Sequence, residues 1–246
     1  MCAITAGQRG RRVLVLDHAK KAGRKILMSG GGRCNFTNLD VGANNFISHN
    51  SHFCRSALTR YTPADFIALV KKHRIPFHEK KHGQLFCDRS SKDILQMLLA
   101  ECQSSGVTIQ LNTSITSIIS SAANQFIIKT SRGSLTTNSC VIATGGLSIP
   151  TMGSSPFGYR IAEQFGIHVW PTRAGLVPFT LHSADKERLQ ELSGIAVDCR
   201  VMCQRQQFEE ALLFTHRGLS GPAALQISSY WQAGDDLTIQ LQPQIN

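Results

Sequence analysis

The sequence lacks a long apolar run, a secretory signal and a cysteine framework. No stretch approaches the roughly 18–20 apolar residues that a membrane-spanning helix needs, and the first twelve residues are too polar for a signal peptide. The eight cysteines are scattered, and the closest pair, Cys199 and Cys203, does not have the spacing of a standard zinc knuckle. We therefore expect a cytoplasmic protein with reduced, mostly buried thiols, no metal site and no membrane partner.

Aromatic residues are also few, at 7% of the 246 residues, and acidic residues are outnumbered by basic ones, 16 to 26. The resulting net charge of +10 is typical of proteins that bind nucleic acid. The basic residues are dispersed, however, with the densest clusters at 71–74 and 80–82, and aromatic side chains do not interleave with them as a stacking platform requires. We predict no nucleic-acid partner and keep a basic nucleic-acid-binding protein as an alternative. A polyanionic dinucleotide would explain a basic cleft equally well.

Residues 23–38 are the most informative stretch and read Gly-Arg-Lys-Ile-Leu-Met-Ser-Gly-Gly-Gly-Arg-Cys-Asn-Phe-Thr-Asn. Three consecutive glycines allow positive φ angles and a close approach of the backbone to a ligand. Arg24, Lys25 and Arg33 flank them, and successive N–H groups in such a loop can bind an anion. The preceding apolar run ends at Asp17, where dinucleotide-binding folds place the acid that hydrogen-bonds the adenosine ribose. Taken alone, these residues fit a dinucleotide site and a flexible loop with surface charges equally well.

The same sixteen residues closely resemble a signature of the BaiN-like (aminoacetone oxidase-like) family of NAD(P)/FAD-dependent flavoprotein oxidoreductases. The resemblance continues through 142–150, 175–179 and 212–222, so it covers essentially the whole chain. It implies an α/β fold, in which a doubly wound, Rossmann-like FAD/NAD(P)-binding domain carries an inserted β-meander and is accompanied by a second, β-rich inserted domain. We place the first domain at 1–170 and the second at 171–246.

The resemblance also implies FAD as the cofactor, with NAD(P)H as a possible electron donor. The residues expected to contact FAD are Asp17, Arg24, Lys25, Ser29, Gly30, Gly31, Gly32, Arg33, Cys34, Asn35, Ile115, Ala143, Thr144, Gly145 and Gly146. Family members have been linked to the reduction of conjugated enones in steroid-like acids and to amine oxidation, so the small organic substrate cannot be carried over. In such enzymes the flavin performs the hydride chemistry and the protein positions it.

Some of these assignments have structural alternatives. Arg24 or Arg33 would instead pair with a protein carboxylate, and Ile115 would instead be a core strand residue. Cys34 has no Cys-x-x-Cys partner, which favours a packed thiol beside the flavin over a redox group. His216 lies in a polar, glycine-rich segment and is a weak candidate for a catalytic proton donor, because histidine titrates near neutrality. Its alternative is a histidine that satisfies a turn.

The residue pattern predicts where the elements lie. Thr62 followed by Pro63, and Ser90 in Ser-Ser-Lys-Asp, are typical helix starts. Helices are predicted at 1–10, 62–73, 90–106, 156–166, 185–192 and 222–231. Strands are predicted from 12 and at 83–87, 107–111, 114–120, 125–130, 134–137, 140–146, 176–181, 195–203, 208–214 and 237–241. The run 140–146 is expected to be a buried parallel strand that leads into a glycine turn.

The chain departs from the family pattern at both ends. Residues 1–10 resemble the tail of the helix that should follow a first strand and a G-x-G-x-x-G turn, which normally hold the pyrophosphate. The glycine-rich segment that closes over the flavin in the family is expected after residue 246. We therefore predict a FAD-dependent oxidoreductase truncated at both ends. The main alternative is a non-catalytic fragment that binds FAD weakly or not at all, with an exposed sheet edge that favours aggregation.

Overall fold

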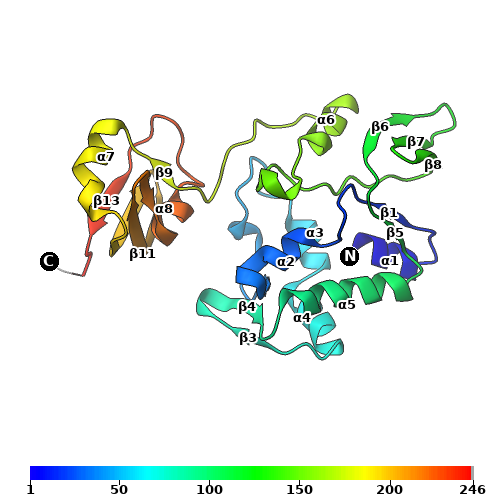
Figure 1. Ribbon diagram of the computed structural model, residues 1–246, viewed down its shortest axis with the longest axis horizontal. Coiled ribbons are helices and arrows are strands. Elements are labelled where there is room, and N and C mark those ends of the chain that lie inside the picture. Colours follow the sequence, from blue (N-terminus) through cyan, green and yellow to red (C-terminus); the bar gives the residue numbers. More distant parts are fainter. Residues whose placement is uncertain (245–246) are drawn as a thin grey trace. The chain divides into compact units, whose positions relative to one another are not determined.

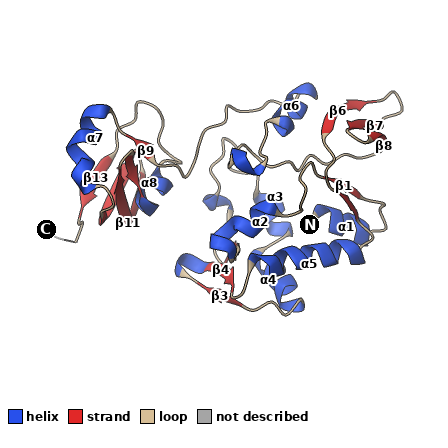
Figure 2. Cartoon of the chain, in the orientation of Figure 1, coloured by secondary structure: helices blue, strands red, loops and turns tan. Residues whose placement is uncertain are grey.

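The computed structural model describes residues 1–244, and the chain divides into two compact units, Met1–His168 and Val169–Asn246. Both units combine helices with strands (Figures 1 and 2), so the predicted α/β class is confirmed. Within residues 1–244, no helix is both long and apolar enough to cross a bilayer.

The N-terminal unit contains short elements. Its helices and 3-10 turns are α1 (Cys2–Gln8), α2 (Arg24–Met28), η1 (Ser29–Gly32), η2 (Ala43–Asn45), α3 (Arg55–Arg60), α4 (Pro63–Lys72), η3 (Lys81–Gly83), α5 (Ser91–Ser104), η4 (Pro150–Met152) and α6 (Phe157–Gln164). Its strands are β1 (Leu14–Leu16), β2 (Asn35–Asn38), β3 (Phe77–Glu79), β4 (Gln84–Cys87), β5 (Thr108–Gln110), β6 (Ile115–Ser120), β7 (Phe126–Thr130) and β8 (Gly133–Thr137). They form three separate small sheets, ordered β1-β5, β2-β4-β3 and β6-β7-β8.

The first of these sheets is a parallel pair. Leu14 of β1 lies opposite Thr108 of β5, and Leu16 lies opposite Gln110. The pairing continues past β1, because the amide of Asp17 donates to the carbonyl of Gln110 at 3.1 Å. The parallel arrangement brings the carboxyl ends of both strands to one edge, which is where α/β folds place their ligands.

The remaining sheets are antiparallel. The predicted β-meander is confirmed as β6-β7-β8, and α6 packs on it through Ile161, which joins Ile118 and Ile128 in one buried cluster. β2, β3 and β4 form the other sheet, against which α4 and α5 bury a second cluster that includes Cys34, Val70 and Cys87.

The predicted starts of α4 and α5 are confirmed, because each has a side chain that satisfies a free backbone N–H group. Thr62 accepts a hydrogen bond from the Asp65 amide at 3.3 Å, and the Asp65 carboxylate accepts one from the Thr62 amide at 2.7 Å, which completes a capping box. Ser90 accepts from the Lys92 amide at 3.2 Å. The hydrogen bonds that the Asp65 carboxylate accepts from the amide and the hydroxyl of Thr62 hold the pKa of Asp65 below its ordinary value.

The predicted buried strand at 140–146 is wrong. Residues 139–146 have no regular secondary structure, and the side chains of Val141 and Ile142 are 65% and 39% exposed. A strand forms only where a neighbour supplies hydrogen-bond partners for its backbone. Among residues 1–244, β5 is the strand that pairs with β1, and no strand pairs with this apolar run.

The C-terminal unit is built on one sheet. Its elements are β9 (Phe179–Thr180), α7 (Ser183–Leu189), η5 (Gln190–Leu192), β10 (Ala196–Cys203), β11 (Gln206–Thr215), β12 (Gly218–Ser220), α8 (Gly221–Ile227) and β13 (Thr238–Leu241). The five strands are ordered β13-β10-β11-β12-β9 and are all antiparallel. The predicted strand at 176–181 is shorter than expected, whereas the long hairpin β10-β11 matches its prediction closely.

α8 covers one face of this sheet and packs against β10, β11 and β12. Its Ala223, Ala224 and Ile227 are fully or almost fully buried and meet Val201 and Leu212 from the strands. The alternation along β10 places Cys199, Val201 and Cys203 on this inner face. Burial raises the pKa of the Cys199 and Cys203 thiols, which fits the prediction of mostly buried thiols. All eight cysteines of the chain are free.

Candidate functional site

The glycine stretch adopts the backbone conformation that its sequence predicts. Gly30, Gly31 and Gly32 have φ angles of +56°, +64° and +84°, in the region where glycine is favoured over other residues. A Cβ on Gly30 would approach the Asn35 nitrogen to 2.7 Å, so that position requires glycine for packing. A Cβ on Gly31 or Gly32 would meet no atom within 4 Å. The backbone is therefore open at these two positions, where a ligand can approach it closely.

The two cations of α2 connect this stretch to the segment 144–153. Lys25 Nζ donates to the carbonyl of Ser148 at 3.2 Å, and Arg24 Nη2 donates to the carbonyl of Thr151 at 3.4 Å. Gly145 has a φ of +75°, and a Cβ there would lie 3.9 Å from Lys25 Nζ. The structure thus brings Arg24 and Lys25 close to the segment 144–153, which lies more than 100 residues later in the sequence.

Asp17 directly follows β1, at the edge of the parallel pair where the carboxyl ends of β1 and β5 lie. One of its carboxylate oxygens accepts from the Ala19 amide at 2.8 Å and lies 3.7 Å from His18 Nδ1. Its side chain is 39% exposed, which leaves acceptor capacity for a ligand hydroxyl. His18 in turn lies against the segment 144–153, because a Cβ on Gly153 would come within 2.7 Å of its Nε2.

Residues 29 and 33–35 position the glycine stretch. The Ser29 hydroxyl donates to the Ile26 carbonyl at 2.7 Å, and the Ser29 carbonyl accepts from the Cys34 amide at 3.0 Å. Cys34 is 5% exposed and packs in the core with Cys87, whose thiol pKa burial and the nearby Cys34 raise to about 12. Cys34 is thus a packed thiol. The side chains of Arg33 and Asn35 are exposed.

Ala143 and Thr144 lie in the irregular segment beside α6. The side chains of both are exposed, and a Cβ on Gly158 of α6 would approach the Thr144 hydroxyl to 2.8 Å. Likewise, a Cβ on Gly146 would lie 3.2 Å from the Tyr159 hydroxyl. Glycine at these two positions therefore allows the segment to lie close to α6.

Two predicted residues lie elsewhere. Ile115 begins β6 opposite Thr130, and its half-buried side chain packs against the cluster around Ile118. His216 is exposed in the turn between β11 and β12, in the C-terminal unit, where the Thr215 hydroxyl accepts from the Gly218 amide at 3.1 Å. Contact of the Ile115 backbone with adenine and proton donation by His216 both stay predictions.

Three further residues of this region, His18, Ser148 and Tyr159, were not predicted from the sequence. Ser148 contributes only a backbone carbonyl, for which no sequence signal exists. The signals for the other two are glycines, since Gly153 and Gly146 leave room for the side chains of His18 and Tyr159. A glycine in the sequence can indicate that another group approaches the backbone closely, but only the fold shows which side chain that is.

These residues fit an adenine dinucleotide such as FAD. The open backbone at Gly31 and Gly32, the cations of α2 and the partly exposed carboxylate of Asp17 are groups of the kind that bind pyrophosphate and ribose. Among residues 1–244, no group of three or more His, Cys, Asp and Glu side chains is arranged to hold a metal ion.

Comparison with known proteins agrees with this geometry. Residues 1–200 match the family model described as the HI0933-like protein Rossmann domain, and residues 173–246 match the HI0933-like protein barrel and H2TH domain. The doubly wound, Rossmann-like class inferred from the sequence is therefore confirmed, and the family is one of FAD-binding flavoproteins.

Three named relatives are similar along the chain. A ribosomal RNA dihydrouridine synthase of Escherichia coli (strain K12) is 55% identical over 246 residues, and one of Haemophilus influenzae (strain ATCC 51907 / DSM 11121 / KW20 / Rd) is 48% identical over 250. Both alignments cover 100% of this chain, which spans 61% and 62% of the two relatives. A 3-dehydro-bile acid delta(4,6)-reductase of Clostridium scindens (strain ATCC 35704 / DSM 5676 / VPI 13733 / 19) is 25% identical over 230 residues, which are 91% of this chain and 55% of the relative.

The family model for the Rossmann domain alone matches more than half of the chain, over the residues that contain the glycine stretch, Asp17 and the segment 144–153. The chain belongs to the HI0933-like family.

Proposed function

We propose that this chain is the larger part of a FAD-dependent oxidoreductase that reduces a uracil base in ribosomal RNA. The observation that carries the proposal is the 55% identity to the E. coli relative named ribosomal RNA dihydrouridine synthase, over the full 246 residues. The H. influenzae relative of the same name, at 48% identity, supports it. A substrate in ribosomal RNA would also agree with the cytoplasmic location predicted from the cysteines.

The chemistry is consistent with the more distant relative. Uracil contains a carbon–carbon double bond conjugated to a carbonyl, and dihydrouridine is the product when that bond is saturated. The name of the C. scindens relative also denotes a reductase. Bound FAD would supply the hydride, taken from NAD(P)H, that adds to one carbon of the double bond while a proton adds to the other. His216 stays the candidate proton donor.

The chain's own residues would hold the cofactor. Asp17 would accept a hydrogen bond from a ribose hydroxyl, and the N–H groups around Gly31 and Gly32 would bind the anionic part. Lys25 and Arg24 donate to carbonyls of the segment 144–153, and they would fix the distance between the two sides of the site while adding positive charge. Positioning of this kind is what a flavoprotein contributes to the reaction.

The distribution of charge supports a polyanionic substrate. The N-terminal unit contains 20 Lys and Arg residues against 8 Asp and Glu, whereas the C-terminal unit contains 6 against 8. The whole positive excess therefore belongs to the unit with the FAD residues. A single bound dinucleotide carries few negative charges, while an RNA substrate would present one phosphate per nucleotide along its path.

The proposal is tested by product analysis. The protein is loaded with FAD, supplied with NADPH or NADH, and incubated with ribosomal RNA that lacks dihydrouridine, and the digested RNA is analysed by mass spectrometry. We expect new dihydrouridine that depends on both FAD and the donor. Protein that retains FAD and oxidises the donor but leaves every uridine unchanged would contradict an RNA substrate and favour the small organic substrate predicted from the sequence.

A non-catalytic chain is the second candidate, favoured by the exposed apolar side chains of Val141 and Ile142 beside the proposed site. It predicts that FAD separates from the protein during desalting. The same mass-spectrometric assay would then show no product with any donor.

A further inference from the structure

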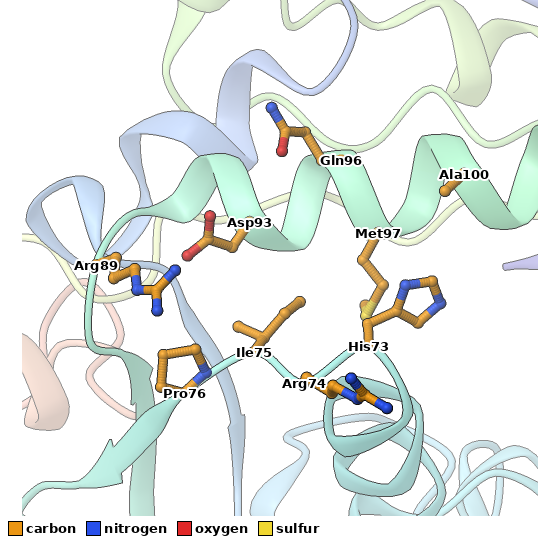
Figure 3. Close-up of a pocket in the computed structure, with 9 residues that line it drawn as sticks. All are labelled: His73, Arg74, Ile75, Pro76, Arg89, Asp93, Gln96, Met97 and Ala100. Atoms are coloured by element: carbon orange, nitrogen blue, oxygen red, sulfur yellow. The ribbon is translucent and has the colours of Figure 1, made fainter.

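A pocket lies in the N-terminal unit, between α5 and the loop that follows α4. It has a volume of about 290 Å³. Arg89 and Asp93 lie at one end and His73 and Arg74 at the other, with Ile75 between them (Figure 3). None of the residues predicted to contact FAD lines it. Ligand pockets usually measure about 300–1,000 Å³, so this one suits a single nucleotide rather than a dinucleotide.

One oxygen of Asp93 is buried and has no hydrogen-bond partner among the described residues. A buried acceptor without a partner is unfavourable, and for a charged group the penalty is larger. Asp93 as a whole is only half-buried, so a ligand that brings N–H or O–H donors to the accessible part of this carboxylate would offset some of that cost. The apolar part of the lining comes from the half-buried Ile75 and Pro76, with Met97 in the core behind them.

Arg74 has an unusual backbone conformation. It follows α4 with a φ of +53°, its amide donates to the Lys71 carbonyl at 2.9 Å, and the Ile75 amide donates to the Val70 carbonyl at 3.2 Å. This is the Schellman arrangement, in which glycine is the usual residue at the position that Arg74 occupies. An arginine there costs conformational energy that a binding role would explain.

The cations and the apolar wall match the parts of a nucleotide. Arg74 and Arg89 are exposed and can reach phosphates at the rim, while His73 is held in the wall by a 2.7 Å hydrogen bond to the buried Glu101. Guanine presents adjacent N–H groups on one edge, and a carboxylate accepts such a pair well. Unpaired RNA bases are recognised in this way, by base-edge hydrogen bonds combined with packing of the ring.

We propose that the pocket between α4 and α5 binds an unpaired guanine nucleotide of the RNA substrate, with Asp93 accepting hydrogen bonds from the base and Arg74 and Arg89 contacting phosphates. This inference rests on the proposed RNA substrate and adds a contact outside the FAD site. It assigns the pocket to substrate positioning and not to the chemical step.

The test uses the full chain loaded with FAD and measures its affinity for labelled oligouridines of about ten nucleotides, a length within the usual range of single-strand sites. One probe carries a central guanosine and the other a central adenosine. We expect the guanosine probe to bind at least about fivefold more tightly, the lower end of the range for one good base contact. Asp93→Asn should abolish that preference while FAD stays bound.

Arg74→Gly separates binding from stability. Glycine relieves the positive φ, so the thermal unfolding midpoint should not fall, yet affinity for the RNA probes should decrease. Together with Arg89→Gln it should reduce the slope of log affinity against log salt by about 1.4, for two lost single-strand phosphate contacts. The matched control is Lys129→Gln with Arg132→Gln, two exposed cations of the meander outside the pocket, which should leave the guanosine preference unchanged.

Three outcomes would overturn the inference. If the pocket variants bind RNA as the unaltered protein does, while the FAD-loaded protein still forms dihydrouridine, the pocket claim fails and the proposed function stands. If free guanosine monophosphate binds as tightly as the guanosine probe, the pocket serves a free nucleotide and not RNA. If the unaltered protein binds neither probe at low salt, the proposed RNA substrate itself fails.

Discussion

The two units achieve stability in different ways. The C-terminal unit has one five-stranded sheet covered by α8, with a single cluster of side chains that includes Leu212 and Ile227. The N-terminal unit divides its strands among three small sheets with separate clusters, and it leaves apolar side chains such as Val141 exposed beside the FAD residues. The N-terminal unit also carries the whole excess of basic over acidic residues. The difference suggests that the C-terminal unit is stable by its own packing, whereas the N-terminal unit depends on its ligands.

The largest expected effect is the loss of stability when a side chain in the core of the C-terminal unit is shortened. Leu212 is 1% exposed at the centre of the C-terminal cluster, so Leu212→Ala should cost about 2–5 kcal/mol of the free energy of unfolding. Calorimetry should show a lower transition for this unit, with the N-terminal transition and FAD binding unchanged. Leu192→Ala, at a position that is 36% exposed, is the control. A shift of both transitions together would show that the units do not unfold separately.

Glu101 provides the corresponding test in the N-terminal unit. Its side chain is 6% exposed and accepts from Lys72 at 2.8 Å and from His73 at 2.7 Å, and these hydrogen bonds lower its pKa. Glu101→Gln should cost about 1–3 kcal/mol in chemical denaturation at neutral pH, the usual range for a buried bond to a charged group. Lys72→Gln should cost less than about 1 kcal/mol, because Lys72 is mostly exposed to solvent.

The pH dependence follows from the direction of that shift. A carboxyl group whose pKa is lower in the folded state stabilises the protein fully above its ordinary value of 4.5, and that contribution is lost as the pH falls further. Stability of the unaltered protein should therefore decrease below about pH 4.5 more steeply than that of Glu101→Gln. Parallel curves for the two proteins would contradict the ion-pair account.

Gly31 tests whether open backbone in the N-terminal unit serves a ligand. Gly31→Val would place a branched side chain at a positive φ in a position that no other atom occupies. We expect a stability loss of about 1–3 kcal/mol from strain, and at least a tenfold loss of FAD affinity, which a titration of flavin fluorescence measures. Gly10→Val, another open position with positive φ, controls for the strain alone. Equal FAD affinity of Gly31→Val and Gly10→Val would contradict the assignment of Gly31 to the FAD site.

The smallest effect is expected at the start of α4. Thr62→Ala removes the hydroxyl that accepts from the Asp65 amide, and the loss of such a cap costs about 1 kcal/mol. Denaturant unfolding should detect the change in the N-terminal transition, while Thr62→Ser should restore most of it. No change with Thr62→Ala would indicate that α4 is held by the packing of Val70 and not by its cap.

The sequence predicted the parts of the fold that local chemistry determines. The caps at Thr62 and Ser90, the positive φ angles at the three glycines and the meander strands all depend on residues close in sequence. The prediction of a strand at 140–146 was wrong because a strand needs a neighbouring strand as its partner, and no local pattern shows whether one is present.

The site was predictable to a similar extent. The motif identified Lys25 and Arg24, but not the Ser148 and Thr151 carbonyls that accept from them, because backbone atoms carry no sequence signature. The unequal distribution of charge, by contrast, needs no structure. The boundary predicted at 170/171 already places 20 of the 26 basic residues in the first domain, and the two units of the structure divide the charges in the same way.

The central claim is that the glycine stretch, Asp17 and the segment 144–153 together hold FAD. The most direct measurement is the visible absorption spectrum of the purified 246-residue protein after incubation with FAD and desalting. The account predicts that the flavin bands stay with the protein after desalting. In a parallel unfolding experiment with free FAD at 100 times its Kd, the free energy of unfolding of the N-terminal unit should rise by about 2.7 kcal/mol. A colourless protein, with both transitions unchanged by FAD, would contradict it.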